Sequence, residues 1–213
     1  MQEHRHYQID NAHQVSLLHI VLKGIAAVLF MVAFYSITSA QNYTFTGAED
    51  DRFENPANWT PAYPGAQIAA GAVVFVEGNA RLNETLILDG TLHIAVGSML
   101  KAEDKAIIIM RSGKLTNDGE LFAASLRNHG TLNNNFSATL ALGHYVSYAG
   151  SATSNLMNAE MLVNGNLVNG GTFNNYSTCI VESKLENTAA FYQMQGSDLQ
   201  VNGAKPAAFS YND

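Results

Sequence analysis

Side chains able to perform acid–base, nucleophilic or phosphate chemistry are few in this chain of 213 residues, and they form no known motif. There is no GxSxG nucleophile elbow, no phosphate-binding P-loop and no GxGxxG after a strand-like run. Acid–base catalysis needs paired carboxylates, or a base within hydrogen-bond reach of the substrate. Glu120, Arg127 and Glu160 are instead scattered along the sequence. We therefore predict no catalytic residue and a protein that is not an enzyme.

Metal ligation is the second chemistry to consider. His93, His129 and His144 have neither HxH nor HxxxH spacing, and no matching Cys or carboxylate motif accompanies them. The acidic triplet 49–51 offers the oxygen ligands that Ca²⁺ prefers. It fits neither an EF-hand nor a GGxGxDxUx repeat, so a solvated loop is the better interpretation. We predict no metal site and no cofactor.

Aromatic side chains offer a third possibility, the binding of a sugar. Trp59 is the single Trp of the chain, and Tyr63 follows it closely. An aromatic face can pack on the apolar face of a sugar ring, whereas a Trp in a cap is more often part of the core. Trp59 and Tyr63 are therefore the candidate glycan contacts, and a core role for Trp59 is the alternative.

Most of the chain follows a nine-residue pattern, Leu-x-Asn-x-Gly-x-Leu-x-Asn. The clean copy runs from Leu126 to Asn134, and drifted copies begin at Leu86, Leu115, Leu156, Leu167 and Leu185. Period two places the Leu, Asn and Gly positions on one side of an extended chain. Strands with one apolar side cannot bury it alone, but stacked copies form a continuous core. The pattern therefore predicts an all-β single-stranded parallel β-helix, or β-solenoid.

The repeat leaves several details open. The gaps between the starts of successive copies are unequal, so they do not decide the length of one coil. The Asn and Gly positions suit left-handed corner residues, and Asn can also form an amide ladder between coils. A β-sandwich of hairpins with Asn-Gly turns is the rival fold. The apolar run 106–110 predicts a strand covered on both faces, and 137–153 is either an excursion loop or a degenerate coil.

Three regions differ in composition. Residues 1–40 contain a polar lead, the apolar run 24–37 and then Thr38-Ser39-Ala40, as in a secretory signal peptide cleaved before Gln41. The alternative is an uncleaved anchor through 15–37. Residues 41–66 hold the Trp and three of the four Pro, which predicts an N-terminal cap with Phe45, Phe53 and Trp59 as its plug. Residues 67–213 form the solenoid, with a first strand at 72–76.

Charge and Cys content exclude some partners. The formal net charge of −7 argues against nucleic acid and against anionic membranes. The only membrane contact expected is the segment 15–37, if the signal is retained. One Cys, Cys179, allows no internal disulfide, so the stacked core must supply the stability.

The run FENPANWTPAYPGA, followed by alternating strands and GTLxNxG-like repeats, resembles the start of secreted β-helical repeat proteins of Bacteroidetes-type bacteria. It also looks like the eight-glycine domain at the front of some large extracellular β-helix proteins. The resemblance covers most of residues 41–195 and implies an N-terminal NW…P…G segment before β-solenoid coils.

From these patterns we expect an exported β-solenoid located outside the cell or at its surface. Its expected role is structural or adhesive and non-catalytic, through a strand face that contacts an extracellular glycan or protein. The alternative is a polysaccharide-active β-helix enzyme or a glycan-binding module.

Overall fold

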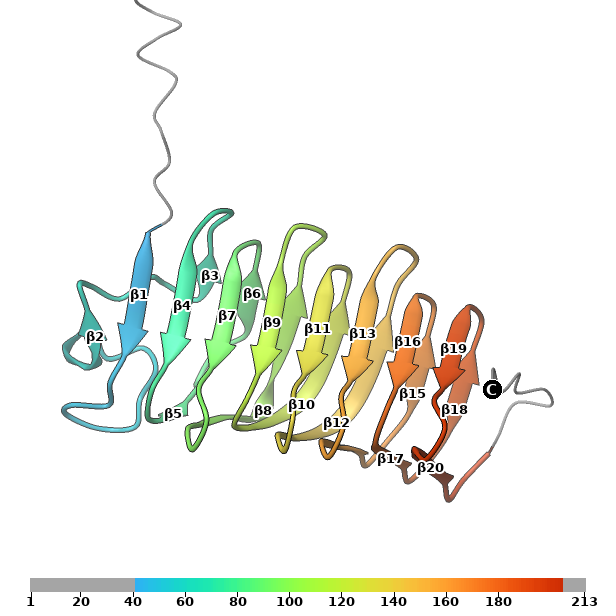
Figure 1. Cartoon of the computed structure of the whole chain (residues 1–213). Helices are drawn as coiled ribbons and strands as arrows, with labels where there is room; N and C mark the ends of the chain where they lie inside the picture. Colours follow the sequence, from blue (N-terminus) through green and yellow to red (C-terminus); the bar gives the residue numbers. More distant parts are fainter. Residues whose placement is uncertain (1–40, 205–213) are drawn as a thin grey trace, which may run out of the picture. The chain divides into compact units, whose positions relative to one another are not determined.

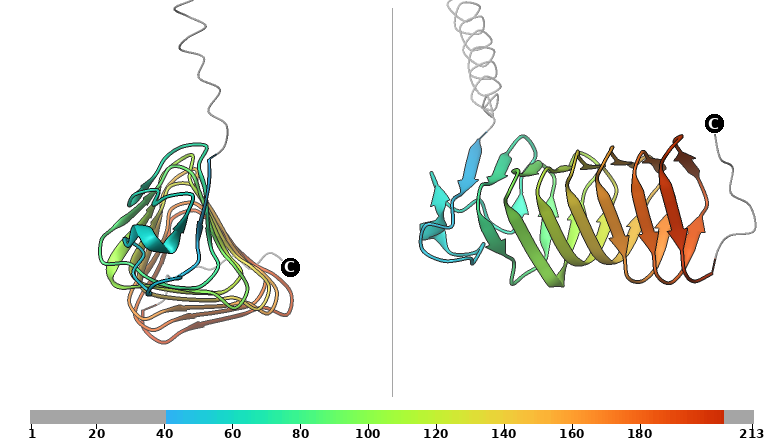
Figure 2. Two further views of the ribbon diagram at one scale, coloured as in Figure 1. Left: turned by 90° about the vertical axis from the view of Figure 1, so that its left-hand side faces the viewer. Right: turned by 60° about the horizontal axis from the view of Figure 1, so that its bottom comes forward.

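The structure is a computed structural model that describes residues 41–204, and these residues form one parallel β-solenoid. The chain winds around a three-sided cross-section and adds one coil beside the last (Figures 1 and 2). The predicted β-solenoid is confirmed. The rival sandwich of hairpins is wrong, because every strand pairing is parallel except that of the first two strands. The expected signal peptide lies outside the described residues.

Each side of the solenoid is a ladder of strands, which we name faces A, B and C. Face A is the nine-stranded sheet, which includes the two-residue strand β2 at its N-terminal edge. Its strands are β1 (Asn42–Phe45), β2 (Trp59–Thr60), β4 (Val73–Val76), β7 (Thr91–Ile94), β9 (Lys114–Asn117), β11 (Thr131–Asn134), β13 (Ala152–Asn155), β16 (Thr172–Asn175) and β19 (Ala190–Gln193).

The second sheet bends to form faces B and C. Three long strands run through both faces: β8 (Met99–Ile109), β10 (Glu120–Asn128) and β12 (Thr139–Ser147). Face B consists of their first halves with β5 (Asn79–Arg81), β14 (Glu160–Val163), β17 (Thr178–Val181) and β20 (Asp198–Val201). Face C consists of their second halves with β3 (Gln67–Ile68), β6 (Leu86–Leu88), β15 (Leu167–Asn169) and β18 (Leu185–Asn187).

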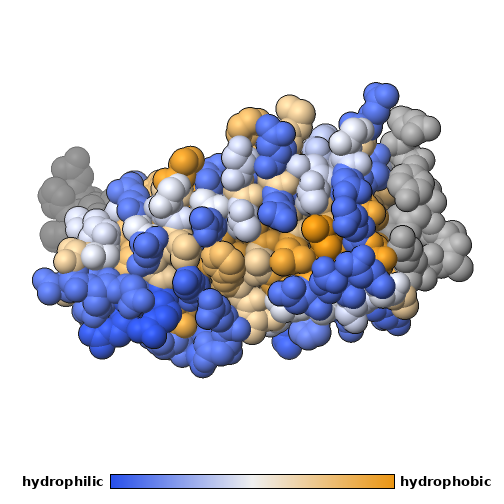
Figure 3. Space-filling view, turned by 90° about the horizontal axis from the view of Figure 1, so that it is seen from below, coloured by the Kyte–Doolittle hydropathy of each residue, from blue (hydrophilic) through white to orange (hydrophobic). Residues whose placement is uncertain are grey.

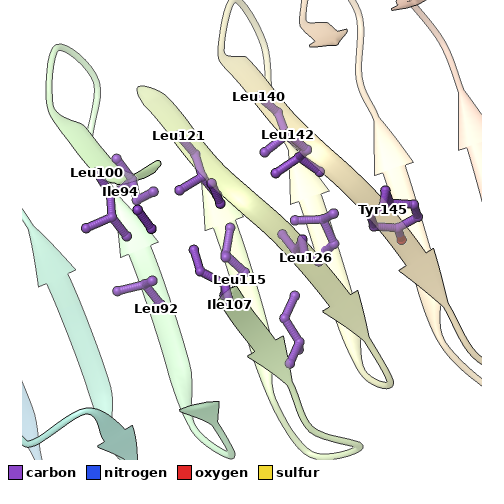
Figure 4. Packing of buried hydrophobic residues seen from close by; sticks show 14 of the residues in the cluster. Leu92, Ile94, Leu100, Ile107, Leu115, Leu121, Leu126, Leu140, Leu142 and Tyr145 are labelled. Carbon is purple, nitrogen blue, oxygen red and sulfur yellow. The ribbon is translucent and has the colours of Figure 1, made fainter. Parts of the chain in front are cut away.

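The core follows from the alternation that the sequence displays. Inward residues of all three faces meet along the axis, as Leu92 of face A, Leu121 of face B and Leu126 of face C illustrate (Figure 4). All three are fully buried. The run 106–110 alternates in the same way, with Ile108 facing outward, so the prediction of a strand covered on both faces was wrong. Residues 137–153 form a regular part of two coils, β12 and β13, rather than an excursion.

The nine-residue pattern turns out to span one corner of the solenoid. Its first half ends β10 on face C, its second half forms β11 on face A, and Gly130 stands at the corner between them. The step from Leu167 to Leu185 is one full coil, because these two residues are partners in adjacent strands of face C. The shorter step from Leu115 to Leu126 instead joins faces A and C within one coil. Copies of the pattern are unequally spaced because they start on different faces.

The corner Gly is required by close packing, not by backbone conformation. A Cβ at Gly130 would stand 2.3 Å from the carbonyl oxygens of Gly113 and Met110 in the preceding coil. The left-handed conformation occurs elsewhere, at turn residues such as Ser137 (φ 61°) and Asn158 (φ 59°). Our expectation that the motif Asn and Gly adopt it is correct for Asn158 and wrong for the Asn and Gly of the clean copy.

The Asn residues that end successive strands of face A point inward and form the expected amide ladder. Asn117, Asn134, Asn155 and Asn175 are stacked in register, and each Nδ2 donates to the side-chain oxygen of the next coil at 2.8–3.1 Å. The last acceptor is Gln193 Oε1. Each Nδ2 also donates to a backbone carbonyl at the start of a face B strand. No buried side-chain nitrogen or oxygen in residues 41–204 lacks a hydrogen-bond partner.

The N-terminal end of the solenoid is closed by aromatic residues. Segment 41–66 contributes β1, which pairs in parallel with β4, and the short 3₁₀ helix η1 (Pro56–Asn58). Phe45 and Phe53 are fully buried, and Trp59 retains 6% of its surface exposed. The Trp59 ring meets both Phe rings edge-on, with centroids 5.3 and 4.7 Å away.

Candidate binding face

Face B carries an apolar row on its outer surface. Phe122, Ala141, Leu162 and Ile180 occupy the same outward register position on β10, β12, β14 and β17, and each remains partly exposed. Outward positions of a solenoid are usually polar, because they face water. Viewed directly, face B shows an apolar band along the solenoid axis with polar residues on both sides (Figure 3). The row leaves no signal in the sequence, because its members come from different coils and alternate with buried residues.

Carboxylates flank the apolar row. On the side toward face A, one register column contains Glu120, Thr139, Glu160, Thr178 and Asp198, so an acidic residue recurs on every second coil. Strands in a sheet lie about 4.8 Å apart, which separates successive acids by roughly 9.6 Å. The acids are exposed. Glu120 and Glu160 are therefore not scattered in space, contrary to our interpretation of the sequence.

The column on the opposite side of the row is acidic at two positions, and the residues between them are Ala124, Gly143 and Asn164. Glu103 stands at the bulge of β8, and Glu182 directly follows β17, where its Oε2 accepts a hydrogen bond from Asn202 at 2.8 Å. Two bases, Arg81 and Lys101, are register partners at the N-terminal end of the row. Face B thus combines an apolar centre with one margin that is acidic on every second coil and a second margin that is acidic at Glu103 and Glu182.

Two depressions accompany this face. One, of about 200 Å³, is lined by Glu103, Phe122, Ala141, Gly143 and Asn164, and it exists because Ala141 and Gly143 are small. The other, of about 620 Å³, lies at the corner between faces A and B. It is lined by residues that include the exposed Met157 and Tyr176 and the carboxylates of Glu160 and Asp198. Both depressions are open to solvent, so they can receive a side chain or part of a polymer.

The predicted glycan contacts lie at the N-terminal end, away from these depressions. Trp59 Nε1 donates to the Phe53 carbonyl at 2.6 Å, and the ring is packed among Phe45, Phe53 and Tyr63. Tyr63 is half-buried and its hydroxyl donates to Glu84 Oε1 at 3.2 Å. Burial, then the nearby Glu84 carboxylate, raises the Tyr63 pKa well above its usual range. These contacts place Trp59 in the core and leave part of Tyr63 accessible.

The acidic triplet 49–51 is engaged in the fold of the cap. Asp50 accepts hydrogen bonds from Arg52 Nε at 2.8 Å and from Asn58 Nδ2 at 2.8 Å. The Arg52 side chain, together with Asn58, holds the Asp50 pKa well below its usual range. The buried Asn58 Oδ1 accepts from the backbone N–H groups of Glu49 and Asp50, at 2.9 and 3.1 Å. These polar groups therefore shape the loop.

The three His side chains lie in separate places. His93 Nε2 contacts Asp118 Oδ2 at the edge of face A, and the other Asp118 oxygen accepts from Asn135 Nδ2 at 2.7 Å. His129 stacks on Tyr148 of the next coil, with ring centroids 3.9 Å apart. His144 Nδ1 accepts from the Asn166 backbone N–H at 3.1 Å. Residues 41–204 contain no group of three His, Cys, Asp or Glu side chains arranged to hold a metal ion.

Comparison with known proteins finds no match: no family model, curated protein or solved structure matches this chain. Within the described part of the chain, no helix has the length and apolarity needed to cross a membrane.

Proposed function

We propose that the protein is an exported, non-catalytic β-solenoid with a structural or adhesive role at the cell surface. Face B is its contact surface for an extracellular protein or glycan. One observation carries the proposal: an apolar row is displayed over four consecutive coils, beside a column of residues that is acidic on every second coil. Apolar patches with a polar rim are characteristic of interaction sites, and a rigid ladder of strands presents such a patch without reorganisation. The signal-like residues 1–40 support export.

The test compares adhesion by matched variants. Purified full-length chain is immobilised on beads, and binding to extracellular matrix proteins, whole cells and a glycan array is measured. Leu162→Asn removes the centre of the apolar row, whereas Val168→Asn makes the same kind of change at an outward position of face C. A tenfold fall in adhesion for Leu162→Asn alone supports face B as the contact surface. Equal adhesion by the two variants would show that face B is not the contact surface.

A second function has a specific observation in its favour. Glu160 and Asp198 both line the larger depression and are two coils, roughly 9.6 Å, apart. Inverting glycosidases separate their two carboxyl groups by about 6.5–9.5 Å, so polysaccharide hydrolysis is the second candidate. Release of reducing ends from a polysaccharide panel, abolished by both Glu160→Gln and Asp198→Asn, would establish it. Absence of activity across the panel would leave the non-catalytic role.

A further inference from the structure

We propose that the partner of face B is a basic amphipathic α-helix of another protein, which lies along the solenoid axis with its apolar stripe on Phe122, Leu162 and Ile180. The inference rests on the proposed function, because it names the occupant of the same face. It follows from the width of the face, the spacing of its residues, its surface depression and its charge, all of which are set by the outward residues of β10, β12, β14, β17 and β20.

The width of face B fits one helix. The two margins are at outward positions four residues apart along the chain, as Glu160 on β14 and Asn164 directly after it show. At about 3.3 Å per residue, this places the margins roughly 13 Å apart. An α-helix with its side chains is about 10–12 Å across, so a helix seated on the apolar row lies between the margins.

The axial spacing also fits a helix. Acids on the Glu120 column recur every second coil, or roughly 9.6 Å. Residues seven apart in an α-helix are about 10.5 Å apart on the same side. Members of the apolar row are one coil, about 4.8 Å, apart, and the apolar residues of a heptad repeat recur every 3.5 residues, or about 5.3 Å. A helix with Lys or Arg beside its apolar stripe therefore aligns with the acids over several coils.

The depression at Ala141 and Gly143 supplies an anchor point. Its volume of about 200 Å³ opens between Phe122 and Asn164, within the width of the face. A large apolar side chain from the partner can enter it, which is how the central residues of an interface contribute most of its binding energy. Helices bind to apolar surfaces through such residues at a spacing of three, four or seven.

Charge favours a basic helix over a second copy of this chain as the occupant. Two copies joined through face B would bring the acids of two Glu120 columns close together, whereas the bases Arg81 and Lys101 lie only at the N-terminal end of the row. Like charges that face each other across an interface are unfavourable. A basic helix instead pairs with the acids of the Glu120 column and with Glu103 and Glu182, and the chain's formal net charge of −7 favours its approach.

A designed peptide tests the inference directly. The probe is a fluorescein-labelled helix of about three heptads, with Leu at positions a and d and Lys at e and g. Its binding to the full-length protein is measured by fluorescence anisotropy, and its helicity by circular dichroism. Control probes are a scrambled peptide of the same composition, a peptide with Glu in place of Lys, and oligolysine.

The expected result is saturable binding of the Leu/Lys helix alone, with a gain in helicity. Leu162→Asn lowers the affinity at least tenfold, and the double variant Glu160→Gln/Glu182→Gln weakens binding and reduces its dependence on salt. Matched changes on face C, Val168→Asn and Glu186→Gln, leave the affinity unchanged. Far-UV circular dichroism verifies that each variant is folded.

Three results would contradict the proposal that a basic amphipathic helix is the partner of face B. These are equal binding of the scrambled peptide or oligolysine, equal loss in the face C variants, and no binding of the Leu/Lys helix. If Leu162→Asn nevertheless abolishes adhesion in the bead assay, face B remains the contact surface and the helix alone is wrong. If adhesion does not depend on Leu162, the proposed function of face B fails as well.

Discussion

Asn134 and Asn155, distant in sequence, are neighbours in adjacent coils, and the Nδ2 of the first donates to the Oδ1 of the second at 2.9 Å. The same Nδ2 donates to the Glu160 carbonyl at 2.8 Å. One amide thereby joins the side chains of two coils, and it also fixes the backbone of Glu160, the first residue of the face B strand β14. Because both side chains are buried, these hydrogen bonds form away from competing water.

Removal of one Asn from the ladder should destabilise the solenoid. We expect Asn155→Ala to lower the free energy of unfolding by about 3 kcal/mol, because it deprives Asn134, Asn175 and the Thr178 carbonyl of buried partners. The outward Ser154→Ala in the same strand should change it by less than about 0.5 kcal/mol. Urea unfolding followed by circular dichroism measures both. Equal midpoints for the two variants would show that the ladder contributes nothing to stability.

The corner Gly should tolerate no side chain. Gly130→Ala would place a Cβ 2.3 Å from two backbone oxygens, and we expect a loss of more than about 4 kcal/mol or failure to fold. Gly150 is the control: its φ is +85°, but nothing lies within 4 Å of the added Cβ. Gly150→Ala should therefore cost only about 1–2 kcal/mol, from backbone strain. A Gly130→Ala protein with the wild-type midpoint would contradict the close approach of the coils.

Cys179 should report opening of the last coils. Its thiol is fully buried on the inner side of β17, and this burial raises its pKa from 9.0 to about 12. We expect no reaction with a thiol reagent at pH 8 until urea unfolds the protein, because the thiolate is the reactive form. The unfolded thiol ionises near pH 9 and the folded one does not. The contribution of Cys179 to stability is therefore complete below pH 9 and falls as the pH rises toward 12. Rapid labelling of the native protein at pH 8 would show that this coil is open.

Trp59 should behave as a core residue of the N-terminal end. Its fluorescence is expected to resist quenching by iodide in the native state. Trp59→Phe should cost about 1–3 kcal/mol, because it removes volume and the hydrogen bond to the Phe53 carbonyl. Tyr63→Phe, which removes the half-exposed contact with Glu84, should cost less than about 0.5 kcal/mol. Strong iodide quenching, or a change in emission on addition of an oligosaccharide, would assign Trp59 to a ligand site.

Several features could be predicted because they depend on neighbouring residues only. The alternation around Leu126 and Leu132 specifies which side chains enter the core, since successive side chains of a strand point to opposite sides. The repetition of the pattern predicts stacked coils, and the repetition of Asn predicts the amide ladder. The role of Gly130 was mistaken because it depends on how closely the preceding coil approaches, and that of the run 106–110 because no other layer covers its outward side in the described residues.

The amino-acid order alone thus predicted the strands, the side of each strand that faces the core, and the solenoid fold. Which outward residues of different coils lie next to one another was decided only by the tertiary structure. Glu120 and Glu160 are far apart in the sequence yet share one column, and Phe122 and Leu162 share the next. This happens because successive coils differ in length as their corners lengthen or shorten. Backbone hydrogen bonding keeps the strands in register while the sequence period drifts, so the surface of face B has no period that can be read from the chain.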